Sequence, residues 1–158
     1  MNAGFRYRHL QSRSKQAGVA AIEFALLFVL FFAIFYALVS YAVTMLLQQS
    51  FTHAAAEGAR AAVAVDPLTY SNSTDFNSAV ETRVKSTIDE ALAWLPAKAK
   101  TEVTGENVQI DWSGSTMTVR LVYSGYATDP MMPVLSLPFI GNVPELPTDL
   151  AGSATITL

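Results

Sequence analysis

The stretch that decides the fold is Gly18-Val19-Ala20-Ala21-Ile22-Glu23-Phe24, followed by a run of apolar residues that continues without a charge to Leu47. From Phe24 to Leu47 the run has 24 residues, which as a helix is ~36 Å long and can cross a bilayer core with some tilt. Glu23 stands at the front edge of this run. Because a charge in hydrocarbon is costly, Glu23 must be neutralised, paired with a cation or held at the interface.

Charge is distributed unevenly on the two sides of this stretch. Four of the 10 Lys and Arg residues precede Val19, whereas all 13 Asp and Glu residues follow it, so the chain after Val19 carries a net charge of -7. Positive charge beside one end of an apolar span favours keeping that end in the cytoplasm. The acidic remainder offers no electrostatic basis for binding nucleic acid. The absence of cysteine excludes disulfides and thiolate chemistry.

Three kinds of segment share a basic start and an apolar run. A secretory signal peptide is disfavoured, because the run is too long and no small-x-small cleavage site ends it. An uncleaved membrane anchor fits the length but leaves Glu23 unexplained. The third kind is a leader that ends in glycine, then four small or apolar residues, then Glu-Phe and a long apolar helix. This pattern resembles a class III prepilin signal, with cleavage between Gly18 and Val19.

The resemblance is closer still to the TadE-like family of the tight-adherence (Tad/Flp) pilus system. Residues 18–26 resemble the start of the segment that members of this family share. Residues 54–62, Ala-Ala-Ala-Glu-Gly-Ala-Arg-Ala-Ala, resemble its end. The resemblance implies a minor pilin (pseudopilin) or assembly component that contributes to filament biogenesis and adhesion. After cleavage, the new α-amine and Glu23, with Phe24 beside it, would serve assembly, the amine of one subunit pairing with the Glu23 of a neighbour.

The same resemblance implies the partners and the place of the protein. The partners are the membrane, a prepilin peptidase, other pilins or pseudopilins and the inner-membrane assembly platform. The chain would cross the bacterial inner membrane once, with the N-terminus cytoplasmic and the C-terminal part periplasmic, and could enter an extracellular pilus. The alternative is an uncleaved single-pass anchor whose periplasmic part is a scaffold of the secretion or pilus machinery.

Two sets of side chains on the predicted helix are candidates for helix packing. Phenylalanines recur at helical spacing and face either lipid or, in a filament, neighbouring helices; they are Phe24, Phe28, Phe31, Phe32 and Phe35. Ala54, Gly58 and Ala62 are spaced four apart and form a small-residue strip that lets another backbone approach, although any alanine-rich helix contains such strips.

The pattern after the apolar run predicts an α+β fold. We expect a leader at 1–18, the apolar helix and an alanine-rich stem at 19–65, and a head at 66–158. Within the head, apolar residues every four positions predict an amphipathic helix at about 75–95, and alternation predicts a hairpin at 108–124 and a closing strand at 154–158. Val103 is expected to begin a short further strand.

The segment 129–150 holds five of the seven prolines and many apolar residues. Such a loop either packs onto the head or forms a contact surface, and we expect packing.

The sequence predicts a protein that is not an enzyme and has no cofactor or metal. No nucleophile elbow, zincin helix or phosphate-binding glycine loop occurs, and both histidines, His9 and His53, lie outside the predicted head. His53 and Glu57 are spaced i, i+4, but two ligands are too few for a metal site, so we expect them on a solvated helix face.

Overall fold

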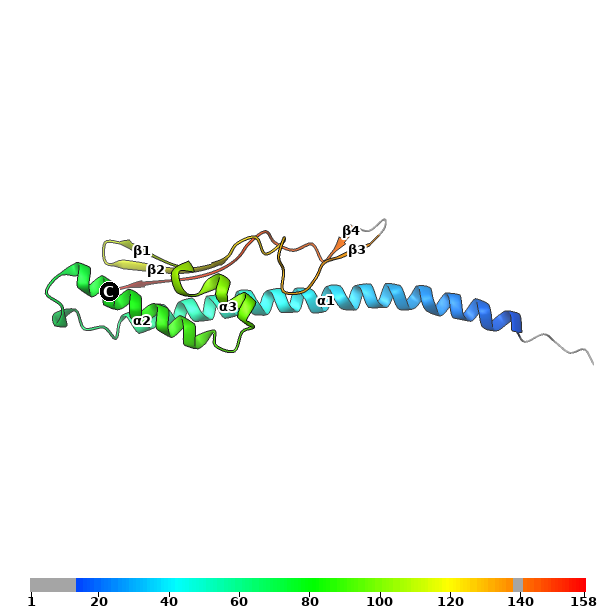
Figure 1. Cartoon of the computed structure of the whole chain (residues 1–158), viewed down its shortest axis with the longest axis horizontal. Helices are drawn as coiled ribbons and strands as arrows, with labels where there is room; N and C mark the ends of the chain where they lie inside the picture. Colours follow the sequence, from blue (N-terminus) through cyan, green and yellow to red (C-terminus); the bar gives the residue numbers. More distant parts are fainter. Residues whose placement is uncertain (1–13, 138–140) are drawn as a thin grey trace, which may run out of the picture. The chain divides into compact units, whose positions relative to one another are not determined.

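The computed structural model describes residues 14–137 and 141–158, and its fold is α+β, as expected (Figure 1). A long helix, α1 (Ser14–Ala62), comes first, followed by helices and an antiparallel sheet. The chain divides into two compact units at the bond between Ala37 and Leu38. The first 13 residues of the predicted leader lie outside the described residues.

The first unit consists, in its described part, of the N-terminal half of α1. No side chain is buried among residues 18–37, the part of this unit whose exposure is described. By length and composition, the stretch Gly18–Ala62 of α1 is the one helix among the described residues that could cross a membrane. A helix that is apolar on all sides is typical of a membrane span or of a protein interior.

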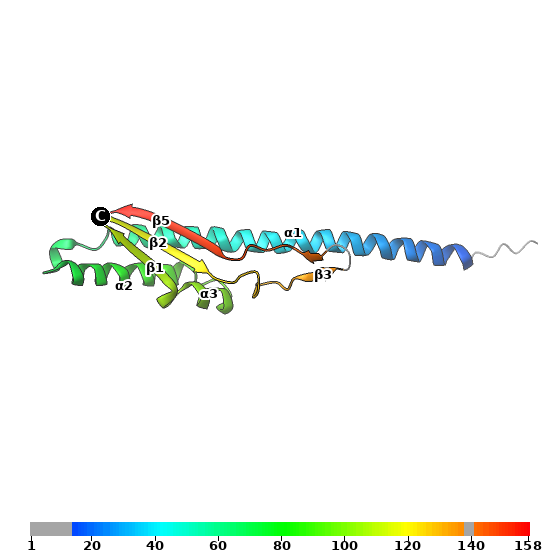
Figure 2. The ribbon, with the colours of Figure 1, turned by 90° about the horizontal axis from the view of Figure 1, so that it is seen from above.

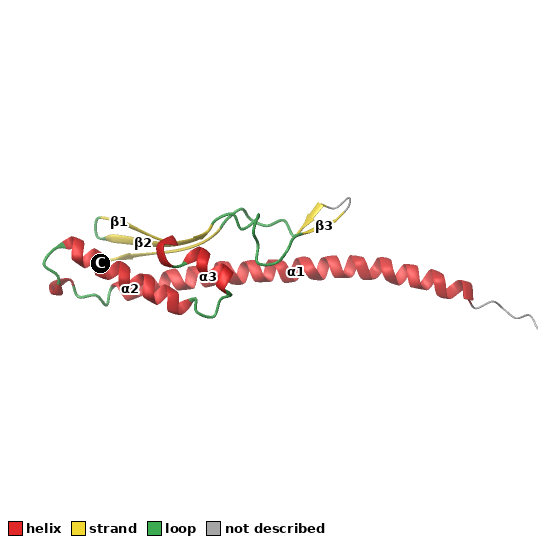
Figure 3. Ribbon diagram, in the orientation of Figure 1, coloured by secondary structure: helices red, strands yellow, loops and turns green. Residues whose placement is uncertain are grey.

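The second unit, Leu38–Leu158, is called the head unit below. It contains the C-terminal half of α1, then the short helical turn η1 (Pro67–Thr69), α2 (Ser73–Ala91), α3 (Ala97–Val103) and η2 (Gly105–Asn107). Its strands are β1 (Val108–Ser113), β2 (Thr116–Tyr123), β3 (Leu135–Leu137), β4 (Gly141–Val143) and β5 (Leu150–Thr157) (Figure 3).

Helix α2 forms where the amphipathic pattern predicted it. The Asn72 side chain caps its N-terminus by accepting a hydrogen bond from the backbone N–H of Asp75 at 2.8 Å. Val80, Val84 and Ile88 are fully buried on one face. The helix ends four residues earlier than predicted, at Ala91, because residues 92–95 form a turn before Pro96.

The main sheet has three antiparallel strands in the order β1-β2-β5. The predicted hairpin and closing strand are both present, and the turn between β1 and β2 contains Gly114 with a φ of 62°. Within the head unit, the sheet lies on one side of the pair formed by α2 and the C-terminal half of α1 (Figure 2). Strand β5 is longer than predicted and begins at Leu150.

Two parts of the sequence prediction for the head differ from the structure. Val103 does not begin a strand but is the last residue of α3, because the alanines and lysines of residues 97–100 are strong helix formers. The hairpin of β3 and β4 inside the proline-rich segment was not predicted. Three-residue strands flanked by prolines carry too little alternation to be recognised.

The core of the head unit includes the C-terminal half of α1. From Ser40 onward, buried residues recur every three or four positions along this helix: Ser40, Thr44, Leu47, Phe51, Ala54, Ala55, Gly58, Ala59 and Ala62. Leu47, Phe51 and the alanines among them form one cluster with the buried faces of α2, α3 and the sheet. The segment 48–65, which the sequence predicted as a stem, thus forms one side of the core. Its small residues allow other elements to pack closely against it.

Strand β5 approaches the backbone of α1 at Gly152. A Cβ at this position would overlap the backbone of Phe51 and Thr52. Glycine is therefore required at residue 152 by the distance between strand and helix, and this contact fixes the sheet on α1.

Candidate functional site

The predicted processing site, Gly18 and Val19, lies in the N-terminal half of α1. A Cβ built at Gly18 would meet no atom of the described structure within 4 Å, and the residue is in a regular helix, where glycine is less favourable than alanine by ~1 kcal/mol. Neither packing nor backbone conformation in the described residues therefore requires a glycine at this position.

Glu23 is exposed on α1 in a region that contains no other acid. Among the residues whose side chains are described, no cation lies within ion-pair distance of its carboxylate. The carboxylate is therefore available to a partner from outside the described part of this chain. Phe24 follows it, with a side chain that is also exposed.

The phenylalanines of this half of α1 form two rows of stacked rings. One row runs from Phe24 through Phe28 to Phe32, with centroids 6.0 and 6.2 Å apart, and the other joins Phe31 to Phe35 at 6.2 Å. All five side chains are about half exposed or more. The described residues leave these apolar side chains exposed. They are therefore accessible to lipid or to neighbouring helices, the two environments that the sequence suggested.

The small-residue strip has its packing partner inside the chain. Ala54 and Ala62 are completely buried, and a Cβ at Gly58 would come within 3.0 Å of Ile88 Cγ1 and 3.1 Å of Val84 Cγ1. The close approach that the spacing predicted is therefore made by α2 of the same molecule.

His53 and Glu57 lie on the exposed face of α1, as expected. Their closest approach is 3.9 Å, and Arg60 binds the same Glu57 oxygen at 2.7 Å. Among the described residues no group of three His, Cys, Asp or Glu side chains could hold a metal ion. The cluster is a surface ion pair of the kind that contributes little to stability.

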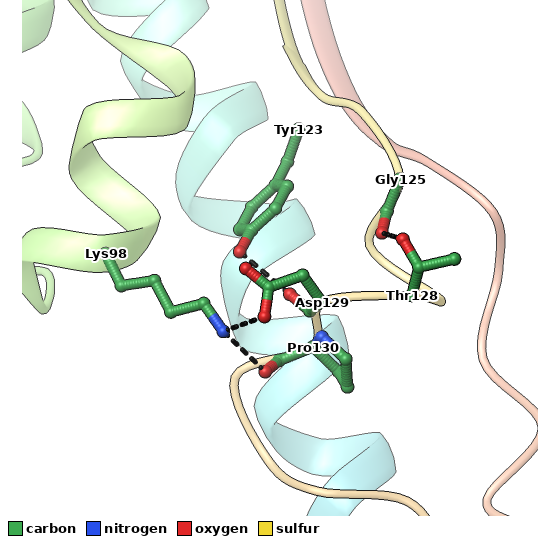
Figure 4. A network of polar contacts seen from close by, with 6 residues as sticks. All are labelled: Lys98, Tyr123, Gly125, Thr128, Asp129 and Pro130. Atoms are coloured by element: carbon green, nitrogen blue, oxygen red, sulfur yellow. Dashed lines mark hydrogen bonds and ion pairs between the residues drawn. The ribbon is translucent and has the colours of Figure 1, made fainter.

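The start of the proline-rich segment is held by a polar network that the sequence did not reveal (Figure 4). The Lys98 ammonium, on α3, donates to Asp129 Oδ1 at 2.5 Å and to the Pro130 carbonyl at 3.0 Å, and the Tyr123 hydroxyl donates to the Asp129 carbonyl at 3.0 Å. The hydrogen bond to Asp129 raises the pKa of Lys98, although desolvation opposes it. Burial raises the pKa of Tyr123.

The proline-rich segment also contacts α1. The Tyr41 hydroxyl donates to the Glu145 carbonyl at 2.8 Å, and the Ser40 hydroxyl lies 3.9 Å from Met132 Sδ. Met131 and Leu146 pack against the core. The segment is therefore attached to the head unit over residues 129–132 and 145–146; residues 138–140 lie outside the described residues.

A hollow of ~510 Å³ lies at the end of the head unit that carries the β1–β2 turn. Its lining is mainly apolar and includes no charged side chain; the residues are Val63, Val65, Pro67, Ser73, Phe76, Asn77, Trp112, Gly114, Ser115 and Leu158. The hollow thus offers no acid, base or cation for chemistry.

Comparison with known proteins gives one family. The family model described as TadE-like protein matches residues 18–60. No curated protein and no solved structure matches the chain.

The matched segment begins at Gly18 and contains Glu23, the phenylalanine rows and most of the small-residue strip. It stops at Arg60, before the segment that forms the rest of the head unit. The match points to a protein associated with the Tad pilus, with one apolar helix that fits a single-pass membrane anchor. Over residues 18–60, the chain is therefore similar to the TadE-like family.

Proposed function

We propose that the chain is a minor pilin (pseudopilin) or assembly component of a Tad-type pilus, and that a prepilin peptidase cleaves it between Gly18 and Val19. The protein crosses the inner membrane once, with residues before Gly18 in the cytoplasm and the head unit in the periplasm. It acts through binding and assembly and not as an enzyme, with sister pilins and the inner-membrane platform as its partners.

The observation that supports this function best is the isolation of Gly18 and Glu23. A glycine that packing does not require, in an exposed helix, is explained by recognition from outside, such as that by a peptidase. An exposed carboxylate without a cation near it among the described side chains is explained by pairing with the α-amine of a neighbouring subunit. The TadE-like match supports both, because it contains both residues.

The length of the head unit favours a minor over a major subunit. A major subunit of the Flp type corresponds to little more than the first helix of this chain. This chain has, in addition, a folded unit with its own core. Such a unit suits a position at which a filament begins or ends.

Mass spectrometry of the chain co-expressed with its cognate prepilin peptidase tests the proposal. The expected mature protein begins at Val19, and Gly18→Leu remains uncleaved although it folds, since the structure leaves room for a side chain there. Ala25→Leu, at another exposed position of α1, is the matched control and is cleaved. A wild-type protein that still begins at Met1 would favour the uncleaved scaffold instead.

A further inference from the structure

We propose that the head unit carries a lipid-binding collar that sits in the outer interface of the inner membrane. The collar consists of Leu38, Met45 and Leu46 on α1, Trp94 after α2, and Met132 and Val134 in the proline-rich segment. The proposal rests on the membrane insertion in the proposed function, and it goes further by assigning a membrane contact to the folded head.

Length along α1 is the first argument. A bilayer core of ~30 Å takes ~20 helical residues. If Glu23 is held at the cytoplasmic interface, as the cost of a buried charge requires, these residues are 24–43. The head unit already begins at Leu38. Its first helical turns therefore lie at the level of the outer leaflet.

The exposed face of α1 at this level is apolar. Leu38, Met45 and Leu46 are 66%, 61% and 49% exposed, and no charged residue occurs on the helix between Glu23 and Glu57. The exposed side of the first turns of the head unit thus suits contact with lipid.

The proline-rich segment adds half-buried apolar side chains to this part of the head unit, Met132 and Val134 among them. It is uncharged from Met131 to Pro144, and charges resume at its two ends, Asp129 and Glu145. Its β3–β4 hairpin lies at the end of the head unit opposite the β1–β2 turn (Figure 2). This distribution of charge suits a segment in which Met132 and Val134 lie at the edge of the hydrocarbon and Asp129 and Glu145 lie among headgroups.

Polar groups of α1 at this level are satisfied inside the protein. The Thr44 hydroxyl donates to the Ser40 carbonyl at 3.0 Å and shares a second hydrogen bond of 3.2 Å with the Tyr126 hydroxyl, and the Tyr41 hydroxyl is bonded to the Glu145 carbonyl. Unsatisfied polar groups are costly in contact with lipid.

Trp94 is the residue of the collar that we expect at the boundary between hydrocarbon and headgroups. It is 58% exposed and lies beside Leu46, Gln49 and His53, just beyond the predicted end of the hydrocarbon at residue 43. Tryptophan is enriched at this boundary, where its ring meets apolar chains and its N–H meets headgroups.

Fluorescence of the two tryptophans tests the collar. The full chain is inserted in phosphatidylglycerol and phosphatidylethanolamine vesicles that contain lipids brominated at different depths. Trp112→Phe leaves Trp94 alone, and we expect quenching by bromines near the glycerol level and a shift of emission to shorter wavelength. The matched variant Trp94→Phe leaves Trp112, near the β1–β2 turn, and is expected to stay unquenched.

A second measurement uses the absence of cysteine from the chain. A nitroxide on Val134→Cys is expected to collide more with oxygen than with a water-soluble nickel complex, and one on Ser115→Cys, in the β1–β2 turn, is expected to show the reverse.

Flotation of the same vesicles separates two kinds of failure. Protein that floats with the membrane while Trp94 and the Val134 label behave as in water would overturn the collar and leave the membrane anchor intact. A blue-shifted Trp94 that no brominated lipid quenches would assign the surface to a contact between copies of this chain, which also overturns the proposal. Protein that does not float would contradict both the collar and the proposed membrane insertion.

Discussion

The two halves of α1 belong to one helix but meet different surroundings. Residues 18–37 bury no side chain and expose most of their apolar ones, whereas residues 38–62 bury one narrow stripe against the rest of the head unit. Large phenylalanines occupy the first half, and alanine and glycine make up most of the buried stripe beyond Phe51. Side-chain size thus separates a surface for lipid or neighbouring subunits from a surface for the chain's own sheet and α2.

The comparison also explains where polar residues are tolerated. In the N-terminal half the only charge after Gly18 is Glu23. In the C-terminal half, the charged side chains of Glu57 and Arg60 are on the exposed face and bind each other. Two polar side chains lie on the buried stripe: the Ser40 hydroxyl is near Met132 Sδ of the proline-rich segment, and the Thr44 hydroxyl is hydrogen-bonded to the hydroxyl of Tyr126, after β2.

The largest effect is expected from removing a phenylalanine ring in the C-terminal half. Phe51 is completely buried, so Phe51→Ala leaves a cavity and should lower the free energy of unfolding by about 3–5 kcal/mol. Chemical denaturation of the full chain in detergent micelles measures it. Phe31→Ala, at a residue 65% exposed in the other half, is the control and should change the stability of the head unit little. Equal losses would mean that the two halves share one core.

A smaller but sharp effect is expected at the contact of sheet and helix. Gly152→Ala places a Cβ onto the backbone of Phe51 and Thr52, and the strand must move away at a cost of about 1–3 kcal/mol or more. Ser153→Ala, on the exposed side of the same strand, should be nearly neutral. Denaturation curves that coincide for the two variants would show that β5 does not pack on α1 at this residue.

Loss of a single buried hydrogen bond should come next. Thr44→Val keeps the side-chain shape but leaves the buried Tyr126 hydroxyl without its partner on α1, at a cost of about 1–3 kcal/mol. Thr52→Val is the control, because Thr52 is exposed and bonds only within its own helix. Thermal unfolding compares them, and an unchanged Tm for Thr44→Val would show that the hydrogen bond to Tyr126 does not stabilise the packing of α1 in the head unit.

The smallest effect concerns alkaline pH. The pKa of Tyr123 lies above its ordinary value of 10.0 because burial disfavours the phenolate, and that of Lys98 lies above 10.5. Both groups therefore contribute stability that is fully present below about pH 10 and is lost as the pH rises through their folded-state pKa values.

Thermal unfolding between about pH 8 and pH 11 checks this dependence. Tyr123→Phe and Lys98→Met should each flatten the alkaline decline, and Lys85→Met, which removes an ion pair to the exposed Glu106, serves as the control. A decline that is identical in all variants would contradict the role of the network around Asp129.

Much of the fold could be predicted from the sequence because its signals are local. Each of these elements has a pattern that is visible within a short stretch of sequence. The patterns are the apolar run of α1, the four-residue repeat of α2 and the alternation in β1 and β2. The β3–β4 hairpin lacked such a signal, and the alanines of α3 outweighed the β-branched Val103.

The role of residues 48–62 could not be predicted from local pattern. Alanine and glycine occur on both buried and exposed helix faces. The sequence of a helix that packs against a core through these residues therefore resembles that of a solvent-exposed stem. Its partners, Gly152 and Ile88, are distant in sequence. In the candidate site, Gly18 was identified from the resemblance to a prepilin signal, Glu23 from its place at the edge of the apolar run, and the phenylalanines from their spacing. Their roles in processing and assembly remain predictions.

Glu23 provides the most direct test of the central claim, that the N-terminal half of α1 serves a filament and not only a membrane. The measurement is the amount of the protein in pili sheared from cells that carry Glu23→Ala, with Glu57→Ala, in the other half of the same helix, as the matched control. The account predicts that Glu23→Ala is inserted in the membrane but absent from pili, while Glu57→Ala is incorporated. Wild-type amounts of Glu23→Ala in pili would contradict it.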